Sequence, residues 1–113
     1  MKECGFNVVR IAEFSWKKME PKEGQYSFGW LHNVVDKMHA AGIGVIMGTP
    51  TATPPSWLYK KYPEMAMLSP SGVRTSHGGR RHCCSNNEHY RKYSIRIAEE
   101  LAKEFADDEN VIG

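Results

Sequence analysis

A short apolar run that breaks into a proline-rich loop constrains the fold of this chain most strongly. Residues 43–48 read Ile-Gly-Val-Ile-Met-Gly and predict a buried strand. The loop that follows, residues 49–58, contains three prolines, three threonines and a tryptophan. Because proline fixes φ, such a loop is held in shape before any ligand binds. In parallel α/β folds the binding face lies at the carboxyl ends of the strands, so this loop indicates which end of the sheet to examine.

A glycine that leads into an apolar strand occurs more than once. Gly5 precedes the strand expected over Val8–Phe14, Gly42 precedes the strand expected over Val45–Gly48, and residues 110–113 resemble a third start. Between the first two strands, Ser27 is expected to cap a helix that ends at Gly42. The apolar residues of that helix recur at helical spacing, at Leu31, Val34, Val35 and Met38.

A second helix is expected before the third strand. Residues 85–88, Ser-Asn-Asn-Glu, match a capping box, with Ser85 as the N-cap. The apolar face of this helix consists of Tyr90, Tyr93, Ile97, Leu101 and Phe105. Strands that alternate with amphipathic helices predict βα units and a parallel sheet, so the fold class is α/β.

The chain is too short for a complete barrel of this class. A (β/α)8 barrel needs about 250 residues, and this chain has 113. Residues 1–4 read as the end of a helix and residues 111–113 as the start of a strand, so we expect a fragment of one domain, incomplete at both ends. A doubly wound sheet has the same local pattern, but the chain contains neither Gly-x-Gly-x-x-Gly nor a P-loop, which disfavours its nucleotide-binding versions.

Composition excludes several classes of partner. The net charge is only +2 and the basic residues are scattered, so nucleic acid is not an expected partner. No apolar run has the length of a transmembrane helix, and no signal-peptide pattern opens the chain, so no membrane partner is expected. Three cysteines are an odd number that suggests no disulfide framework, which favours a cytoplasmic location.

Three segments carry candidate binding residues. Glu13 lies with Arg10 in an apolar strand, where the two form a structural ion pair or Glu13 faces the site. Trp16 and Trp57 lie in loops beside polar groups, a pattern suited to stacking on a sugar ring, although Trp16 is equally suited to packing. Arg80, with its neighbouring arginine, offers fixed donors for a carboxylate or for vicinal hydroxyls, or else belongs to a solvated basic patch.

The cysteines give a weaker signal. Cys83 and Cys84 are adjacent, so their side chains diverge and cannot form a Cys-x-x-Cys clamp. A tetrahedral zinc site needs four ligands, and His82 with one thiol is not enough. Without further ligands both are unremarkable thiols, and Cys4 is expected to pack at a helix end.

Four blocks in order resemble one known family. These are Asn7–Phe14, residues 19–26 with Met-Glu-Pro, Gly24 and Tyr26, residues 48–58 with Gly-Thr-Pro-Thr-Ala-Thr-Pro-Pro-x-Trp-Leu, and Arg80-Arg81-His82-x-Cys84. Together they resemble the glycoside hydrolase family 42 β-galactosidases across essentially the whole chain. The resemblance implies a (β/α)8 TIM barrel, with this chain covering roughly its second to fourth βα units.

The resemblance also implies a chemistry. The family removes terminal β-D-galactosyl residues with retention, needs no cofactor, and is often trimeric. It implies that Arg80 binds galactose and that Cys84 is a ligand of a structural zinc found in some members. The family's acid/base glutamate follows an asparagine, whereas Glu109-Asn110 has the reverse order. Neither catalytic carboxylate is therefore expected in this chain, which alone is expected to be inactive.

The sequence is also compatible with two other functional hypotheses. The first is another retaining barrel glycosidase with a different sugar preference. The second is a module without enzymatic activity that binds a metal through His82, Cys83 and Cys84, or polyanions through its arginines.

Overall fold

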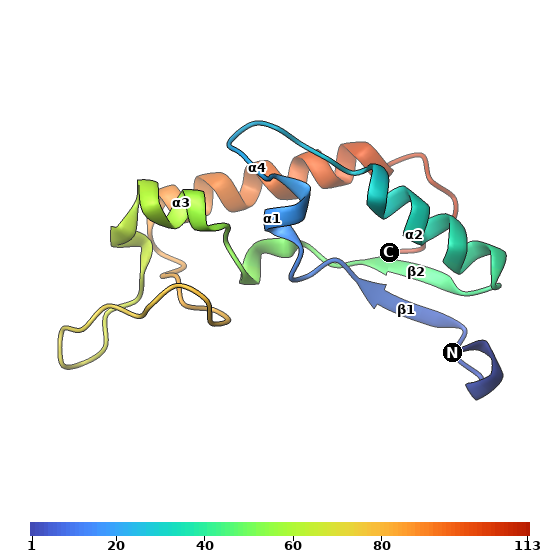
Figure 1. The fold of residues 1–113 in the computed structure, drawn as a ribbon, viewed down its shortest axis with the longest axis horizontal. Coiled ribbons are helices and arrows are strands. Elements are labelled where there is room, and N and C mark those ends of the chain that lie inside the picture. The colour runs from blue at the N-terminus through green and yellow to red at the C-terminus, as the bar shows by residue number, and fades with distance from the viewer.

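Two parallel strands form the centre of the computed structural model, which describes residues 1–113 (Figure 1). Strand β1 (Val8–Ile11) pairs with β2 (Gly44–Met47), from Val8 opposite Gly44 to Ile11 opposite Met47. Val111 forms a parallel bridge with Val45 on the other edge of β2. The predicted α/β class and the parallel order of the three apolar segments are therefore confirmed.

Both strands end before the predicted positions. Strand β1 was expected to reach Phe14, but Ala12 has a φ of +85°. A positive φ is incompatible with the extended backbone of a strand. The strand therefore ends at Ile11, and the backbone turns at Ala12. Strand β2 ends at Met47 rather than Gly48, and the chain then enters the proline-rich loop.

Helix α2 (Gly29–Ala40) connects the two strands. Its predicted N-cap, Ser27, is wrong: the N-cap is Phe28, and no side chain caps the helix. The predicted face is correct in outline, since Leu31 and Val35 are fully buried. The predicted end is confirmed, because Gly42 follows the helix with a φ of +66°, the left-handed geometry for which glycine is favoured.

Helix α4 (Glu88–Phe105) is the longest element and runs along most of the molecule (Figure 1). It begins two residues later than the capping box predicts. Asn87, not Ser85, is the N-cap, and its side-chain oxygen accepts a hydrogen bond from the Tyr90 N–H at 3.0 Å. The predicted apolar face is buried at Tyr93, Ile97, Leu101 and Phe105, whereas Tyr90 is half-buried.

Short elements complete the chain. They are the 3-10 helices η1 (Lys2–Cys4), η2 (Pro50–Ala52) and η3 (Pro63–Met65), and the helices α1 (Trp16–Met19) and α3 (Ser56–Lys61). Helix η1 ends at Gly5 with a φ of +79°, as expected of a terminating glycine, but Cys4 is exposed rather than packed. No helix combines the length and the apolarity needed to cross a membrane.

A buried carboxylate joins four parts of the core. Glu20 is fully buried and pairs with Arg96 of α4. Trp16 donates its indole N–H to Glu20 Oε2 at 2.9 Å, and the backbone N–H of Gly24 donates to Oε1 at 2.8 Å. Trp57 of α3 donates to the backbone carbonyl of Glu20 at 2.9 Å. One residue thus connects α1, the loop after it, α3 and α4.

A second cluster lies beside the first. Lys61 and Tyr93 both bond to the carboxylate of Glu23, with the Tyr93 hydroxyl 2.5 Å from Oε1. Burial, and then the hydrogen bond to this carboxylate, raise the pKa of Tyr93 to about 12. Tyr93 therefore stays protonated as a donor and joins α4 to the loop of residues 20–26.

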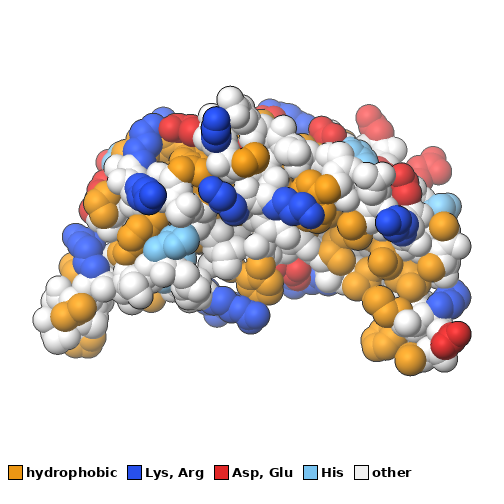
Figure 2. All heavy atoms as spheres, in the orientation of Figure 1, with side chains coloured by type: hydrophobic (Ala, Val, Ile, Leu, Met, Phe, Trp, Pro, Cys, Tyr) orange, Lys and Arg blue, Asp and Glu red, His pale blue; other side chains and the backbone are white.

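One face of the small sheet carries no covering element. Val8 and Ile46 are 38% and 37% exposed, and Ile112 beside them is 59% exposed. Figure 2 shows apolar side chains gathered around the end of the molecule that holds the strands and the N-terminus. Parallel sheets are normally covered on both faces, so this face is suited to contact further structure.

We predict that Glu20→Gln destabilises the fold. An amide offers only one acceptor oxygen to donors from Trp16, Gly24 and Arg96, and it leaves the Arg96 charge unpaired. Breaking a buried pair costs about 3–5 kcal/mol. Chemical denaturation of the whole protein measures this. Glu104→Gln is the matched control, because Glu104 pairs with His32 on the surface and a surface pair contributes about 0–1 kcal/mol. Equal stability of the two variants would contradict the prediction.

Candidate functional site

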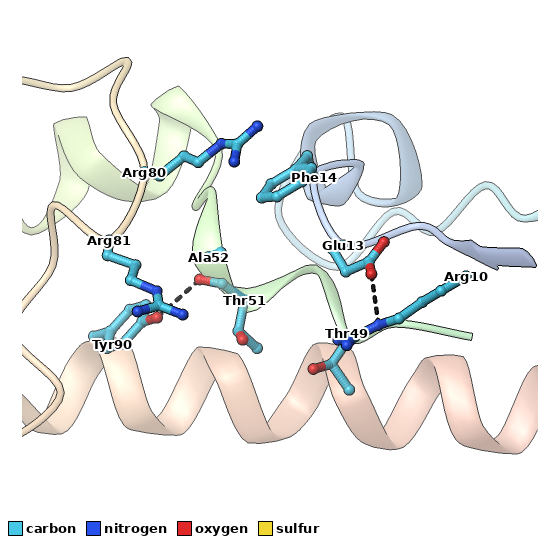
Figure 3. A pocket seen from close by; sticks show the side chains of 9 residues that line it. All are labelled: Arg10, Glu13, Phe14, Thr49, Thr51, Ala52, Arg80, Arg81 and Tyr90. Carbon is cyan, nitrogen blue, oxygen red and sulfur yellow. Dashed lines mark hydrogen bonds and ion pairs between the residues drawn. The ribbon is translucent and has the colours of Figure 1, made fainter. Parts of the chain in front are cut away.

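A pocket of about 570 Å³ opens at the carboxyl ends of β1 and β2 (Figure 3). Its wall comes from the end of β1 with the turn after it, the loop after β2, the loop before α4, and α4 itself. The residues that line it are Arg10, Glu13, Phe14, Thr49, Thr51, Ala52, Arg80, Arg81 and Tyr90. The pocket thus lies at the end of the sheet that the sequence indicated.

Glu13 reaches the pocket because the chain turns sharply at Ala12. Its Oε1 lies 2.5 Å from Arg10 Nε, so the two residues form an ion pair (Figure 3). Gly48 makes room for this side chain, since a Cβ at that position would lie 2.4 Å from Glu13 Cγ. The two interpretations of Glu13 given above are therefore compatible: it is ion-paired, and it lines the pocket.

Arg80 extends over the opposite side of the pocket. Its guanidinium carbon lies 4.3 Å from the ring centroid of Phe14 (Figure 3). The Phe14 side chain is 51% exposed to solvent. The guanidinium over its ring forms a cation–π contact, which stabilises the ring in this exposed position. Glu13 and Arg80, two of the four predicted binding residues, thus lie in one pocket, brought together from segments far apart in the sequence.

Two hydrogen bonds fix the loops around this pocket. The backbone N–H of Arg81 donates to the Ala52 carbonyl at 3.1 Å, and the Tyr90 hydroxyl donates to the Thr51 carbonyl at 2.8 Å. Arg81 adopts a φ of +53°, in the left-handed region that residues with a side chain rarely occupy. Figure 3 shows the two arginine side chains pointing in different directions.

The pocket suits a ligand with several hydroxyl groups. Arginine side chains supply donors, Glu13 supplies acceptors, and Thr49, Thr51 and Tyr90 add hydroxyls. Glu13 is the only carboxylate among the lining residues. A pair of carboxyl groups that could share acid/base and nucleophilic roles is therefore not present in this pocket.

Sequence reasoning missed several lining residues. Arg10 was considered only as the partner of Glu13, and Tyr90 only as a core residue. The threonines of the loop carried a usable signal, because they alternate with rigid prolines directly after a strand. Phe14 gave none, since its exposure depends on the turn at Ala12.

The geometry does not meet the expectation that Trp16 and Trp57 line this pocket. Trp16 is fully buried and donates to Glu20. Trp57 is half-buried, donates to the Glu20 carbonyl, and packs edge-on against Tyr93 at a centroid distance of 5.8 Å. Both indoles lie in the core below the pocket, where the N–H of Trp16 donates to the Glu20 carboxylate and that of Trp57 donates to the Glu20 backbone carbonyl.

The described residues do not form a metal site. No group of three or more His, Cys, Asp or Glu side chains is arranged to hold a metal ion. Cys83 is buried, and this burial raises the pKa of its thiol to about 11, so the thiolate is disfavoured. Cys84 is half-buried, and all three cysteines are free thiols. A zinc ion would need ligands from outside this chain.

Comparison with known proteins decides the family. The sequence profile described as beta-galactosidase of glycoside hydrolase family 42 matches residues 1–113. The chain belongs to glycoside hydrolase family 42. The family predicted from the four sequence blocks is confirmed.

Relatives of this family match along the whole chain. It is 47% identical over 113 residues to the beta-galactosidase BgaA of Clostridium cellulovorans and 42% identical to a beta-galactosidase of Thermus thermophilus. The solved beta-galactosidase of the haloarchaeon Halorubrum lacusprofundi superposes with a TM-score of 0.94 at 39% identity and 100% coverage of this chain. The chain spans only 17–18% of the length of these three relatives.

Proposed function

We propose that this chain is part of a retaining β-galactosidase that hydrolyses terminal β-D-galactosyl residues. One observation carries the proposal: Arg80 and Glu13 meet in a polar pocket at the carboxyl ends of parallel strands, in a chain of a family of beta-galactosidases. That end of a (β/α)8 barrel is where active sites are built.

The same proposal gives the chain a place in the barrel. Strands β1, β2 and the segment at Val111 lie in sequence order and in parallel, as successive barrel strands do. We assign them to roughly the second to fourth βα units. The uncovered apolar face at Val8 and Ile46 would then face the barrel interior, packed by the remaining strands.

Within the site, Arg80 donates hydrogen bonds to galactose hydroxyls and Glu13 accepts them. The ion pair with Arg10 keeps Glu13 in place as an acceptor. Retaining hydrolysis needs two carboxyl groups about 5–5.5 Å apart, so the acid/base and the nucleophile belong to other parts of the protein. Trp16 and Trp57 act indirectly, by supporting the loops.

The arginines give the direct test. In the whole protein, Arg80→Ala should reduce kcat/KM on a galactoside more than Arg81→Ala does. A charged hydrogen bond to substrate contributes about 1.5–3 kcal/mol, equivalent to about tenfold to more than a hundredfold in efficiency. Arg81 is the matched control because it is the neighbouring arginine of the same pocket, with its side chain beside Tyr90 rather than over Phe14. Near wild-type efficiency of Arg80→Ala would contradict the assignment.

Substrate preference distinguishes the proposed β-galactosidase from the alternative of a retaining glycosidase that favours another sugar. Another retaining barrel glycosidase would share the pocket but favour a different sugar. Activity of the whole protein on a panel of aryl glycosides, with galactoside, glucoside and mannoside compared at equal concentration, distinguishes the two. The proposal requires the galactoside to be preferred.

Cys84, rather than Cys83, is the ligand that this chain would contribute to a structural zinc. A thiol must lose its proton to bind zinc, and burial opposes this at Cys83. If the whole protein contains zinc, Cys84→Ser should lower its zinc content and Cys83→Ser should not, as measured by elemental analysis. Zinc loss in Cys83→Ser alone would reverse the assignment. No chemical step depends on this metal.

Residues 1–113 expressed alone should show no galactosidase activity and should self-associate. The pocket has one carboxylate, and the exposed apolar face with open strand edges favours association. Activity assays, sedimentation and thermal melting measure this. A monodisperse monomer with a sharp transition would contradict the expectation on stability, and measurable turnover would contradict the absence of the catalytic pair.

The remaining proposals concern the location, the oligomeric state and the partners of the whole protein. The three free thiols suit a reducing, cytoplasmic location. We further propose that the whole enzyme assembles as a homo-oligomer, with a trimer as the expected form, and takes neither nucleic acid nor membrane as a partner.

A further inference from the structure

The Arg80 guanidinium has no polar partner in this chain. No hydrogen bond or ion pair holds it, and its contact is with the ring of Phe14, whose centroid lies 4.3 Å from the guanidinium carbon (Figure 3). The backbone before it is permissive, since Gly78 has a φ of +113° and is followed by a second glycine. A long, exposed side chain of this kind loses rotamer freedom when its donors are held in one place. The aromatic ring is therefore the group that restrains Arg80.

Phe14, by contrast, belongs to a segment that the core holds in place. The Ala12 carbonyl accepts a hydrogen bond from the Ser15 N–H at 3.0 Å, which closes the turn that carries the ring. Helix α1 begins directly after this turn, with Trp16 fully buried and bonded to Glu20. The structure thus holds an exposed aromatic ring at the pocket, where its face is available to a cation.

A contact with an aromatic ring suits an arginine whose donors are needed by a ligand. A guanidinium attracted to a ring face uses none of its five N–H donors on a hydrogen-bond acceptor. An ion pair does use them, as Arg10 shows with Glu13 in the same pocket. Phe14 can therefore restrain Arg80 and still leave its donors available for hydroxyl groups.

We propose that Phe14 is a positioning residue for galactoside binding and that it acts through Arg80. The inference rests on the proposed function, in which Arg80 donates hydrogen bonds to galactose hydroxyls. The ring limits the positions that the guanidinium can occupy before substrate binds, so less rotamer freedom is lost on binding. The contribution of Phe14 to catalytic efficiency therefore depends on the arginine and disappears when the arginine is removed.

A double-mutant cycle in the whole protein tests this dependence. Phe14→Leu removes the aromatic face and keeps an apolar side chain, and it is made both in the wild-type protein and together with Arg80→Ala. Phe14→Tyr keeps the ring and shows whether the conservative variant restores efficiency. Phe6→Leu is the matched control, because Phe6 is similarly exposed, at 54%, and does not line the pocket. The readout is kcat/KM on a galactoside, divided by the fraction of the enzyme that is folded as measured by circular dichroism.

We expect Phe14→Leu to lower kcat/KM about 2- to 30-fold in the wild-type protein, the range of a cation–π contact from exposed to desolvated sites. It should cause no further fall beside Arg80→Ala, Phe14→Tyr should recover most of the loss, and Phe6→Leu should match the wild type. An equal fall in both backgrounds, an equal loss in Phe6→Leu, or a Phe14→Tyr enzyme as impaired as Phe14→Leu overturns the positioning role and leaves the proposed function intact. A wild-type enzyme without activity on the galactoside overturns the proposed function itself.

Discussion

The carboxylate of Glu20 is the interaction on which the other contacts of this structure depend. A fully buried carboxylate is costly unless each oxygen is paired, and here the donors come from α1, from the loop after it and from α4. The indole of Trp16, a backbone N–H of the following loop, and Arg96 of the long helix all converge on it. Because Trp57 bonds to the carbonyl of the same residue, the start of α3 is fixed at the same point. The proline-rich loop that walls the pocket therefore begins at β2 and ends at this cluster.

This arrangement explains how a chain with two short strands can position a polar pocket. The loop of residues 49–55 is stiff by composition, and it is attached to its surroundings through the Thr51 and Ala52 carbonyls. Glu13 and Arg80 approach it from opposite sides, one through a turn with positive φ and the other through a stacked aromatic ring. Rigidity of the loops, rather than depth of the core, holds the binding groups in place.

The spacing of apolar residues was enough to predict the buried faces of the two long helices and the order of the strands. The burial of Leu31, Val35, Ile97 and Leu101, and the parallel order of the strands, follow from spacing alone. Both helix starts were misplaced, because Asn87 competes as a cap with Ser85 and because α2 begins without any side-chain cap. The roles of the two tryptophans could not be predicted, since both bond to Glu20, whose burial depends on its pairing with Arg96, far away in the sequence.

The close approach of Gly48 to Glu13 has a consequence for how this site can change over evolution. A Cβ at position 48 would overlap Cγ and the carboxyl carbon of Glu13. A residue other than glycine at position 48 therefore requires the Glu13 side chain to leave its present position or to be replaced by a shorter one. The order of change therefore matters: Glu13 can be shortened while Gly48 stays, whereas replacement of Gly48 first displaces a side chain that lines the pocket.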